Sequence, residues 1–432
     1  MVEERRLLLR RRGRDGYDPW SLDDYLRDGG YEALKKALDH GPRWAVNEVS
    51  KSRIRGRGGA GFHAGFKWES VAMQREAPKY LIANFDEGEE GTIKDRTIVE
   101  TDPYLLIEGM TIAAYAMGIE KGFIYNRGEY PFFPPRFEKA MEAAREKKLL
   151  GRSIMGREFN FDMEVVRGAG AYVCGESSAI LESIMGRAGK AKIKIRRTSV
   201  SGVFHSPTCV NNVETLSNVP YIIMEGGETY RNIGTTQSTG TRIVSLTGHV
   251  KNPGAYEVEM GKCTVWEIID GLGGGVDGSD IKAVLLGGAS GSLIRKGDLD
   301  LNYTMEDAES AGLTLGSGVI VVFNEKTCMV DMVHNLMGFF AHESCGKCTP
   351  CRTGTHHLLR IMEGLRRGQA GDDDLVLAKR IADTMCSASI CGLGKTASVP
   401  LTSAIQNFQD EFNSHIRGEC PAGRCPMGGG GR

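Results

Sequence analysis

Apolar residues in the first half of the chain follow two different periods, which predict strands that alternate with helices. Continuous apolar runs of strand length occur at 79–84 and at 122–126. Between and after them, residues 105–117 and 136–148 carry apolar side chains at helical spacing. Strands that alternate with helices favour an α/β domain, which we assign to residues 1–240.

The pattern changes beyond this domain. Residues 241–328 consist of short apolar strands and turns with one short helix, which predicts a small α+β domain. Residues 329–418 are mostly helical in pattern, interrupted by loops that contain cysteine, and predict a helical bundle. The last segment, 419–432, is rich in glycine and is expected to be a flexible tail with two cysteines.

Composition narrows the class of protein. The 432 residues carry a net charge of −1 with 25% charged residues, a balance that does not favour nucleic-acid binding. No apolar run is long enough to span a bilayer, so we expect no direct membrane insertion. Eleven cysteines without a secretory signal favour metal ligation in a reducing, cytoplasmic compartment. The arginine-rich residues 1–13 are predicted to form a solvated arm.

Four cysteines give the strongest chemical signal. Cys345, Cys348 and Cys351 are spaced C-x2-C-x2-C, and Cys391 follows forty residues later. Four thiolates in this arrangement are the ligand set of a [4Fe–4S] cluster. Structural zinc is an alternative, although zinc sites usually pair two C-x2-C motifs. Unliganded buried cysteines are the remaining alternative, and they fit a tight triplet poorly.

A second metal site is predicted near the C-terminus. His415, Cys420 and Cys425, joined by Cys386, would supply the three thiolates and one imidazole of a zinc site. The spacing is looser than in common zinc fingers. The alternative is a pair of free cysteines in a frayed chain end.

A glycine-rich loop begins at Gly56 and reads Gly56-Arg-Gly58-Gly-Ala-Gly61. This matches the dinucleotide-binding fingerprint, but the preceding residues 48–55 are polar and charged, whereas the fingerprint follows a buried strand. We therefore reject a Rossmann site. Backbone N–H groups of such a loop can still hold a phosphate that Lys67 neutralises. A simple tight turn is the alternative.

Two further loops carry polar groups that suit a cofactor. The acidic loop at 84–96 ends a predicted strand, where α/β proteins place ligand-contacting side chains. Its carboxylates can accept hydrogen bonds from sugar hydroxyls. The segment 211–215 reads Asn-Asn-Val-Glu-Thr and is predicted to be a loop whose paired amides bind a phosphate or a ring carbonyl.

Together these motifs resemble the FMN/[4Fe–4S] flavoprotein subunit of NADH dehydrogenases, the 51-kDa type of complex I. The same family supplies the diaphorase subunits of soluble hydrogenases and formate dehydrogenases, some of them electron-bifurcating, and the chain is more similar to that branch. The resemblance covers about residues 50–415 and implies a ubiquitin-like β-grasp fold for 241–328. It rests on these motifs: Arg55-Gly-Arg-Gly-Gly-Ala-Gly-Phe62, Asp86-Glu-Gly-Glu89, Lys94-Asp-Arg96, Gly168-Ala-Gly-Ala-Tyr172, Cys174-Gly-Glu176, Asn211-Asn-Val-Glu-Thr215 and Glu343-Ser-Cys-Gly-Lys-Cys-Thr-Pro-Cys-Arg352.

The resemblance also implies which residues bind the cofactors. Those expected to bind FMN are Gly56, Gly58, Lys67, Asn84, Asp86, Glu87, Gly175, Glu176, Asn211, Asn212 and Thr215. Those expected near the nicotinamide nucleotide are Phe62, Glu89, Ser177, Lys194, Arg196 and Arg197. No side chain is expected to act as an acid or base, because the flavin carries the hydride chemistry; Glu87 and Glu176 are expected nearest to it.

The implied function is electron transfer. A nicotinamide exchanges two electrons as hydride and an iron–sulfur cluster exchanges one at a time, and a flavin converts between the two. Expected partners are a small thioredoxin-like [2Fe–2S] subunit, an iron–sulfur or catalytic subunit of a hydrogenase or formate dehydrogenase, and ferredoxin. The alternatives are the NADH-input subunit of a respiratory NADH:quinone oxidoreductase, or a structural subunit that has lost its flavin.

The chain departs from the family where the adenosine end of the nucleotide is expected. Family members usually have a second glutamate after Cys-Gly-Glu, and this chain has Ser177. A Lys-Pro-Pro-Phe-Pro segment of the family is replaced by Lys194-Ile-Arg196-Arg197-Thr. Removing a carboxylate and adding arginines favours a 2′-phosphate, so we predict a preference for NADP(H) over NAD(H). The alternative is a basic surface loop in a protein that uses NAD(H).

Overall fold

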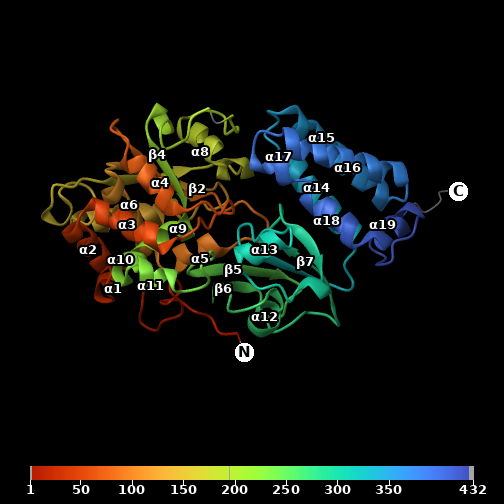
Figure 1. Cartoon of the computed structure of the whole chain (residues 1–432), viewed down its shortest axis with the longest axis horizontal. Coiled ribbons are helices and arrows are strands. Elements are labelled where there is room, and N and C mark those ends of the chain that lie inside the picture. The colour runs from red at the N-terminus through yellow and green to blue at the C-terminus, as the bar shows by residue number, and fades with distance from the viewer. Residues whose placement is uncertain (1, 194, 428–432) are drawn as a thin grey trace.

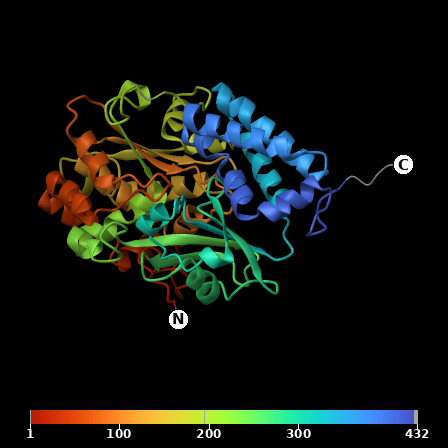
Figure 2. The same cartoon turned by 45° about the vertical axis from the view of Figure 1, so that its right-hand side comes forward.

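The computed structural model describes residues 2–193 and 195–427, which form three units (Figure 1). An α/β unit lies on the left of that view, a helical unit on the right, and a smaller sheet below and between them. The turned view in Figure 2 keeps this arrangement. No helix among the described residues combines the length and apolar character needed to cross a bilayer.

The α/β unit is built on a four-stranded parallel sheet with the order β3–β2–β1–β4. Its central strand β1 is almost wholly buried, as its apolar sequence predicts. In the register, Asn84 of β1 lies opposite Tyr125 of β2 and Asn212 of β4, so the carboxyl ends of these strands meet at one edge. The strands are β1 Tyr80–Phe85, β2 Lys121–Asn126, β3 Asp162–Arg167 and β4 Thr208–Asn212.

Helices pack around this sheet. The longest, α6, begins where Asp102 accepts a hydrogen bond from the Leu105 N–H, and ends at Gly118, whose φ of 66° is left-handed. The helices of the unit are α1 Leu22–Arg27, α2 Glu32–His40, α3 Pro42–Ser52, α4 Ala64–Ala72, α5 Lys94–Thr101, α6 Pro103–Met117, α7 Pro134–Glu146, α8 Ser177–Ile184, α9 Val213–Ser217, α10 Val219–Glu225 and α11 Gly227–Arg231.

One expectation for this unit is wrong. The sequence predicts a loop at Asn211 and Asn212, but these residues end strand β4, which pairs in parallel with β1. The segment is short and polar at its end, so its strand character comes from pairing with a buried neighbour and not from its own sequence.

The second unit is a five-stranded mixed sheet with the order β6–β5–β9–β7–β8, the β-grasp unit. Its first and last strands, β5 and β9, are parallel neighbours at the centre, and the other pairs are antiparallel. The elements are β5 Thr241–Gly248, β6 Gly254–Glu259, α12 Val265–Glu267, β7 Ile281–Leu286, β8 Ser292–Arg295, α13 Met305–Ser310 and β9 Val319–Asn324.

Strand β8 is not predicted from the sequence, because it has only four residues at the edge of the sheet. The helical unit seals this edge. The Leu293 N–H donates to the Ser403 hydroxyl at 3.0 Å, and the Leu293 carbonyl accepts from the Asn407 amide at 2.8 Å. These bonds satisfy backbone groups that an edge strand would otherwise expose.

The helical unit follows directly. Its two longest helices, α15 and α16, run beside each other, and α14 packs on α15 (Figure 1). The helices are α14 Met329–Glu343, α15 Thr349–Arg366, α16 Asp372–Ala388, α17 Gly392–Thr396, α18 Val399–Asn407 and α19 Gln409–Ile416.

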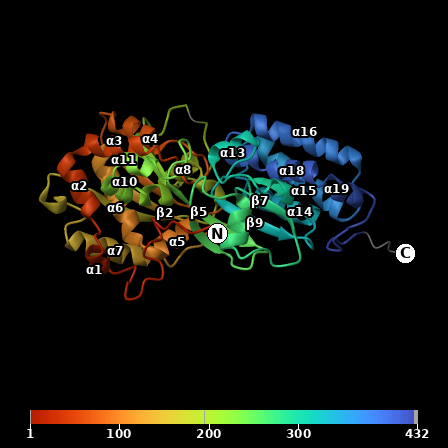
Figure 3. The ribbon, with the colours of Figure 1, turned by 60° about the horizontal axis from the view of Figure 1, so that its bottom comes forward.

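The N-terminal segment corrects another expectation, because it is not a solvated arm. Leu8 and Leu9 are buried, and their N–H groups donate to the Glu257 carboxylate of β6 at 2.9 and 3.0 Å. The buried Arg11 guanidinium pairs with Asp102 of the α/β unit. Figure 3 shows the N-terminus against the β-grasp unit. The segment therefore fastens two units together.

Candidate functional site

The three units meet around a cavity of about 360 Å³. The carboxyl ends of β1 and β4 form its base, at the edge of a parallel sheet where α/β proteins bind ligands. The glycine loop at 58–60 and the turn at 172–176 form two walls. The β-grasp unit contributes Ser290 and residues 314–317, and α17 closes the cavity from the helical unit. The site therefore requires all three units.

Two polar side chains at the end of β1 face this cavity. The Asn84 amide donates to the Gly175 carbonyl at 2.9 Å, and its carbonyl oxygen accepts from the Asp86 N–H at 3.1 Å. The Asp86 Oδ2 atom is buried without a hydrogen-bond partner. Burial, against the opposing charge of Arg127, raises the pKa of Asp86 to about 8. A buried acceptor on a cavity wall indicates a ligand that donates a hydrogen bond.

This pKa predicts how cofactor affinity changes with pH. With a pKa of about 8, Asp86 is largely protonated at neutral pH when no ligand donates to it, whereas a ligand hydroxyl that donates to it, as the resemblance implies for FMN, would favour the carboxylate. Binding then releases a proton, so the Kd for FMN should fall by up to about tenfold per pH unit from pH 6 to 8. Fluorescence titration of the apoprotein measures this slope.

Asp86→Asn is the matched control for this slope, because it keeps the shape and cannot ionise. In this variant, the only remaining pH dependence of the Kd for FMN should come from titration of the cofactor's own phosphate. Equal slopes in the parent and Asp86→Asn would show that Asp86 does not accept from the cofactor.

Glycines shape the wall next to these acceptors. A Cβ atom at Gly58 would lie 3.1 Å from the Asn212 side chain, and one at Gly88 would lie 3.2 Å from the Tyr172 ring. At Gly175 it would approach the Asp86 carbonyl oxygen to 3.4 Å. Side chains at these positions would narrow the cavity. Glycine keeps the space open, so that the backbone can approach a flat or phosphorylated ligand closely.

A buried charge network supports the base of the cavity. The Lys94 ammonium contacts Asp95 Oδ1 at 2.7 Å, Glu214 Oε2 at 3.1 Å and Asn212 Oδ1 at 3.1 Å. Asn212 in turn donates to Asp95 Oδ2 at 2.7 Å. Glu214 also accepts from the Ile243 N–H at 3.0 Å, which extends the network into the β-grasp unit. These bonds fix the Asn212 amide at the cavity wall.

Tyr172 connects the cavity with the other two units. Its hydroxyl donates to Glu89 Oε2 at 3.0 Å, and Glu89 accepts from the Ser290 N–H and hydroxyl of the β-grasp unit at 3.0 and 2.9 Å. Its backbone N–H donates to Glu343 of α14 at 2.9 Å, and its ring lies 5.2 Å from that of Phe339. Tyr172 thus ties the cavity wall to the helix that leads into the cysteine loop.

The four cysteines predicted as cluster ligands surround one small void. Cys345, Cys348, Cys351 and Cys391 all line it, together with apolar groups that include Val173 and Leu393. Cys351 is buried, and burial with the neighbouring thiols raises its pKa to about 11. Leu393 lines this void and the larger cavity, so the two sites are adjacent.

Comparison with known proteins agrees with this geometry. Residues 49–221 match the model of the Nuo51 FMN-binding domain. Residues 331–415 match the NADH-ubiquinone oxidoreductase-F iron–sulfur binding region, and residues 242–322 match the SLBB domain. The chain is 42% identical over 407 residues to an NADH-quinone oxidoreductase subunit of Rhizobium meliloti (strain 1021), covering 94% of this chain and 96% of that protein. The chain belongs to this flavoprotein family.

Two further relatives are hydrogenase proteins. NADP-reducing hydrogenase subunit HndC of Solidesulfovibrio fructosivorans is 40% identical over 426 residues, covering 98% of this chain and 86% of that protein. The crystal structure of an NAD+-reducing [NiFe]-hydrogenase in the H2-reduced state superposes with a TM-score of 0.83 at 33% identity. That match covers 90% of this chain, which spans 65% of the hydrogenase chain.

Membership in the family identifies the cofactors as FMN and a [4Fe–4S] cluster, and the protein as an oxidoreductase subunit. The residues present fit both groups. The unpartnered Asp86 Oδ2 and the glycine wall suit FMN, and the four thiols around one void suit the cluster. Bound FMN supplies exchange between hydride and single-electron transfer, and this chain's residues hold and orient it.

The structure brings only part of the expected cofactor-binding set to the cavity wall. Others lie behind that wall as supports: the Thr215 hydroxyl accepts from the Arg57 N–H at 2.9 Å, and Asn211 accepts from the Trp68 indole at 3.1 Å. Lys67 donates to the Val210 carbonyl. Those on the wall are Gly58, Asn84, Asp86, Glu87, Glu89, Gly175, Glu176 and Asn212, and those not on it are Gly56, Lys67, Asn211, Thr215, Phe62, Ser177, Arg196 and Arg197. Lys194 lies outside the described residues.

Glu87 and Glu176 use their carboxylates to hold backbone in place. Glu87 accepts from the N–H groups of Asp95 and Arg96 at 2.7 and 3.0 Å, where α5 begins. Burial, followed by the charge of Asp95, raises its pKa to about 7. Glu176 caps α8 by accepting from the Ser178 N–H at 2.7 Å. Both residues therefore position the loops that line the cavity.

Several wall residues are absent from the predicted set. Lys94, Asp95 and Tyr172 lie within motifs that resemble the family, so those motifs could have predicted them as wall residues. Ser290, Ser317 and Thr396 come from other units and carry no sequence signal, because only packing of the units brings them to the cavity.

The C-terminal metal-ligating group differs from the predicted one. Cys328, His415, Cys420 and Cys425 place one ligand atom each within 4.8 Å of one another. Cys386, which the sequence predicts as the fourth member, is exposed on α16 and is not part of the group. Cys328 takes its place, because it is the N-cap residue of α14, which packs against α19, and its Sγ atom lies 3.3 Å from His415 Nε2. A residue 87 positions earlier in the sequence could not be recognised as a partner of His415 from spacing.

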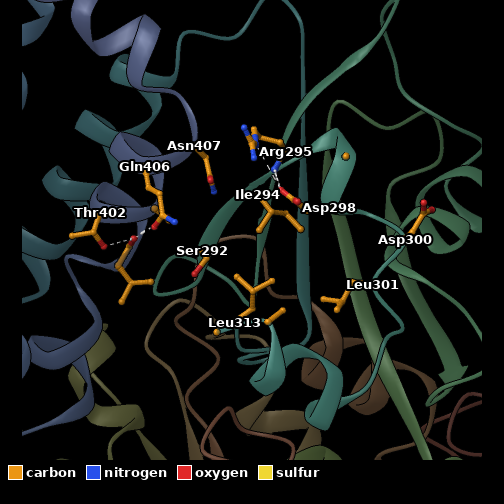
Figure 4. A pocket seen from close by; sticks show the side chains of 15 residues that line it. Ser292, Ile294, Arg295, Asp298, Asp300, Leu301, Leu313, Thr402, Gln406 and Asn407 are labelled. Atoms are coloured by element: carbon orange, nitrogen blue, oxygen red, sulfur yellow. Dashed lines mark hydrogen bonds and ion pairs between the residues drawn. The ribbon is translucent and has the colours of Figure 1, made fainter.

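A separate hollow of about 660 Å³ lies between the β-grasp and helical units. Thr402, Gln406 and Asn407 of α18 line one side, and Ser292 and Arg295 of β8 line the other (Figure 4). It shares no lining residue with the flavin cavity. The bonds that seal β8 occupy its Ser403 and Asn407 side chains.

Proposed function

We propose that this chain is the diaphorase subunit of a hydrogenase or formate dehydrogenase complex and that it exchanges hydride with NADP(H) in preference to NAD(H). Single electrons then pass between FMN and the cluster and on to partner subunits. The proposal includes a cytoplasmic complex and, as domains, residues 1–240, 241–328, 329–418 and a tail at 419–432. Electron transfer between FMN and the cluster is supported by one observation: Leu393 lines both the cavity and the void between the four cysteines, so the two sites are adjacent.

The hydrogenase branch is supported by the similarity to HndC over 98% of this chain. The expected partners are a thioredoxin-like [2Fe–2S] subunit and an iron–sulfur or catalytic subunit, with ferredoxin as a further reactant in a bifurcating complex. Identification of the co-purifying subunits tests this part. Membrane subunits of a quinone oxidoreductase in the complex would instead favour the NADH-input alternative, which the similarity to the Rhizobium meliloti protein keeps open.

A different class of function is a structural subunit that has lost its flavin. The cavity argues against this alternative. A scaffold subunit would have no reason to keep a buried, unpartnered carboxylate oxygen facing a 360 Å³ cavity. The visible spectrum of the purified protein distinguishes the two, since a colourless, iron-free protein would support the scaffold.

The proposed preference for NADP(H) rests on the charges expected near the adenosine end of the nucleotide. Ser177 lies beside Glu176, with its hydroxyl 3.2 Å from Glu176 Oε1, in the position where the family usually has a second carboxylate. Arg196 and Arg197 are exposed on the loop that follows α8. A missing carboxylate and two guanidinium groups favour a 2′-phosphate over a hydroxyl.

We expect kcat/KM for NADPH to exceed that for NADH by about tenfold or more, and Ser177→Glu to lower the NADPH value by about tenfold, the effect of one charge repulsion near the phosphate. Steady-state reduction of ferricyanide by each nucleotide measures both. Gln369→Glu adds the same charge at an exposed turn of the helical unit and should change neither value. A clear NADH preference in the parent protein would contradict the proposal.

We also propose that Cys328, His415, Cys420 and Cys425 bind zinc. The His415 ring donates from Nδ1 to the Glu411 carbonyl at 2.7 Å, which leaves Nε2 to face Cys328 and Cys425 at 3.3 and 3.4 Å. A second hydrogen bond of this kind orients ligating histidines in metal sites. Three thiolates and one imidazole are a common structural zinc set.

The zinc proposal predicts about one zinc per chain beyond the iron of the cluster, and a lower thermal midpoint after its removal. Elemental analysis of the parent and of the Cys420→Ser/Cys425→Ser double variant measures this. Cys386→Ser is the matched control, since Cys386 is exposed and outside the group. The same zinc content in the double variant would rule the site out.

A further inference from the structure

One hydroxyl group adjoins the four cysteines that are expected to bind the cluster. Ser344 ends α14 as its C-cap residue, directly before the cysteine loop, and lines the void between those cysteines. Apart from the cysteines, the other lining residues are apolar except for Lys347, which is exposed. Among the described residues that line this void, Ser344 therefore supplies the only hydroxyl.

The Ser344 hydroxyl is placed to donate a hydrogen bond to one of the cysteines. Its Oγ atom lies 3.2 Å from the Sγ atom of Cys351. The same Oγ atom accepts from the Gly346 N–H at 3.4 Å, which uses a lone pair and leaves its own hydrogen free. A cysteine that ligates a metal is a thiolate without a hydrogen, so in the cluster-bound state Ser344 is the donor of this pair.

The surroundings strengthen this hydrogen bond. Cys351 is 4% exposed, and apolar residues such as Val173 and Leu393 line the void beside it. A hydrogen bond is electrostatically stronger in such a low-dielectric environment, and one to an ionised acceptor is about twice as strong as one between neutral groups. The exposed ammonium of Lys347 is screened by water and salt instead. Ser344 is therefore the lining side chain with the larger expected effect on the sulfur ligands.

We propose that Ser344 is a positioning residue that raises the reduction potential of the [4Fe–4S] cluster by donating to the Cys351 thiolate. On reduction one electron is added, no covalent bond forms or breaks, and the hydroxyl proton stays on Oγ. The added negative charge is shared by the sulfur ligands, so the hydrogen bond stabilises the reduced state more than the oxidised state. The proposal rests on the proposed function only in requiring that the cluster is present.

A purely structural role for Ser344 is the alternative. The bond from the Gly346 N–H shapes the loop between Cys345 and Cys348, and its loss alone would lower the stability of the loop or the iron content. It would not change the free-energy difference between the oxidised and the reduced cluster. The reduction potential therefore distinguishes the two roles.

The test compares three variants of the full-length protein. Ser344→Ala removes the hydroxyl, and Ser344→Thr keeps it. Thr355→Val is the matched control, because Thr355 is buried one turn along α15 and its hydroxyl donates to the Cys351 carbonyl at 2.9 Å, not to the sulfur. A redox titration monitored by electron paramagnetic resonance gives the midpoint potential of the cluster, and elemental analysis gives the iron content.

Ser344→Ala should lower the equilibrium constant for one-electron reduction of the cluster by about tenfold, a shift of about 59 mV to more negative potential. Ser344→Thr should restore most of this loss, because its hydroxyl can donate to the same sulfur. Thr355→Val should have the midpoint potential of the parent protein. An unchanged midpoint potential in Ser344→Ala would overturn the proposal.

Partial loss of iron does not prevent this measurement, since the midpoint potential does not depend on the fraction of chains that hold a cluster. Anaerobic reconstitution with iron and sulfide restores clusters in a variant that has lost them. If Ser344→Ala holds no cluster even then, Ser344 serves assembly and the proposal is wrong. Absence of iron from the parent protein would instead contradict the proposed function.

Discussion

Cys391→Ala is expected to abolish electron transfer to protein acceptors while leaving flavin reduction intact. Cys391 precedes α17, whose residues Gly392 and Leu393 also line the flavin cavity. Loss of one thiolate of four removes the cluster or leaves it labile. We expect reduction of ferredoxin or cytochrome c to fall at least about a hundredfold, and ferricyanide reduction directly from flavin to change by no more than a few-fold.

The measurements are the electron paramagnetic resonance signal of the reduced cluster, the iron content and the two activities. Cys386→Ser is the control, because Cys386 lies five residues earlier, is exposed and touches neither site. It should retain full iron content. Normal transfer to protein acceptors by Cys391→Ala, with iron lost, would show that electrons leave the flavin by another route.

Lys94→Met is expected to be the most destabilising of these substitutions. Lys94 is buried, and its ammonium is held by Asp95 and Glu214, which are buried as well. Burial lowers its pKa, but the two carboxylates outweigh this and raise it, so the ammonium contributes fully at neutral pH and until the pH passes that raised value. Removing one member of a buried charge network costs about 3–5 kcal/mol of unfolding free energy, because the remaining charges are unpaired.

Denaturant unfolding monitored by circular dichroism measures this loss. Lys121→Met is the matched control, since Lys121 forms an exposed pair with Glu164 at 3.4 Å and should cost no more than about 1 kcal/mol. The double variant Lys94→Met/Glu214→Gln should cost less than the sum of the two single changes. Equal losses in Lys94→Met and Lys121→Met would show that the network contributes no stability.

Much of the fold could be predicted from the sequence. The runs at 79–84 and 122–126 correspond to β1 and β2, and the helical pattern at 105–117 corresponds to α6. These segments bury continuous apolar surface, so their periodicity is strong. Strands β4 and β8 escape prediction because each depends on a neighbour: β4 on pairing with buried β1, and β8 on the side chains of α18.

The candidate site was predictable where its chemistry lies within one segment. The Cys345–Cys351 spacing predicts the cluster ligands, and the acidic loop supplies Asn84 and Asp86. Cys328 looks isolated in the sequence, because its partners lie 87 to 97 positions away. The burial of the N-terminal segment was missed for a similar reason. A cluster of arginines predicts exposure to solvent, and only the ion pair between Arg11 and the distant Asp102 allows this one to be buried.

Contiguous patterns and fixed spacings along the chain predict the local elements, the four cysteines expected to bind the cluster, and the family. That three units close one cavity, and that the void between these cysteines shares a wall with it, follows from tertiary packing alone. Tertiary packing also decided that Cys328 completes the C-terminal metal-ligating group. These features arise from packing between segments distant along the chain, and packing depends on complementary surfaces that no local period records.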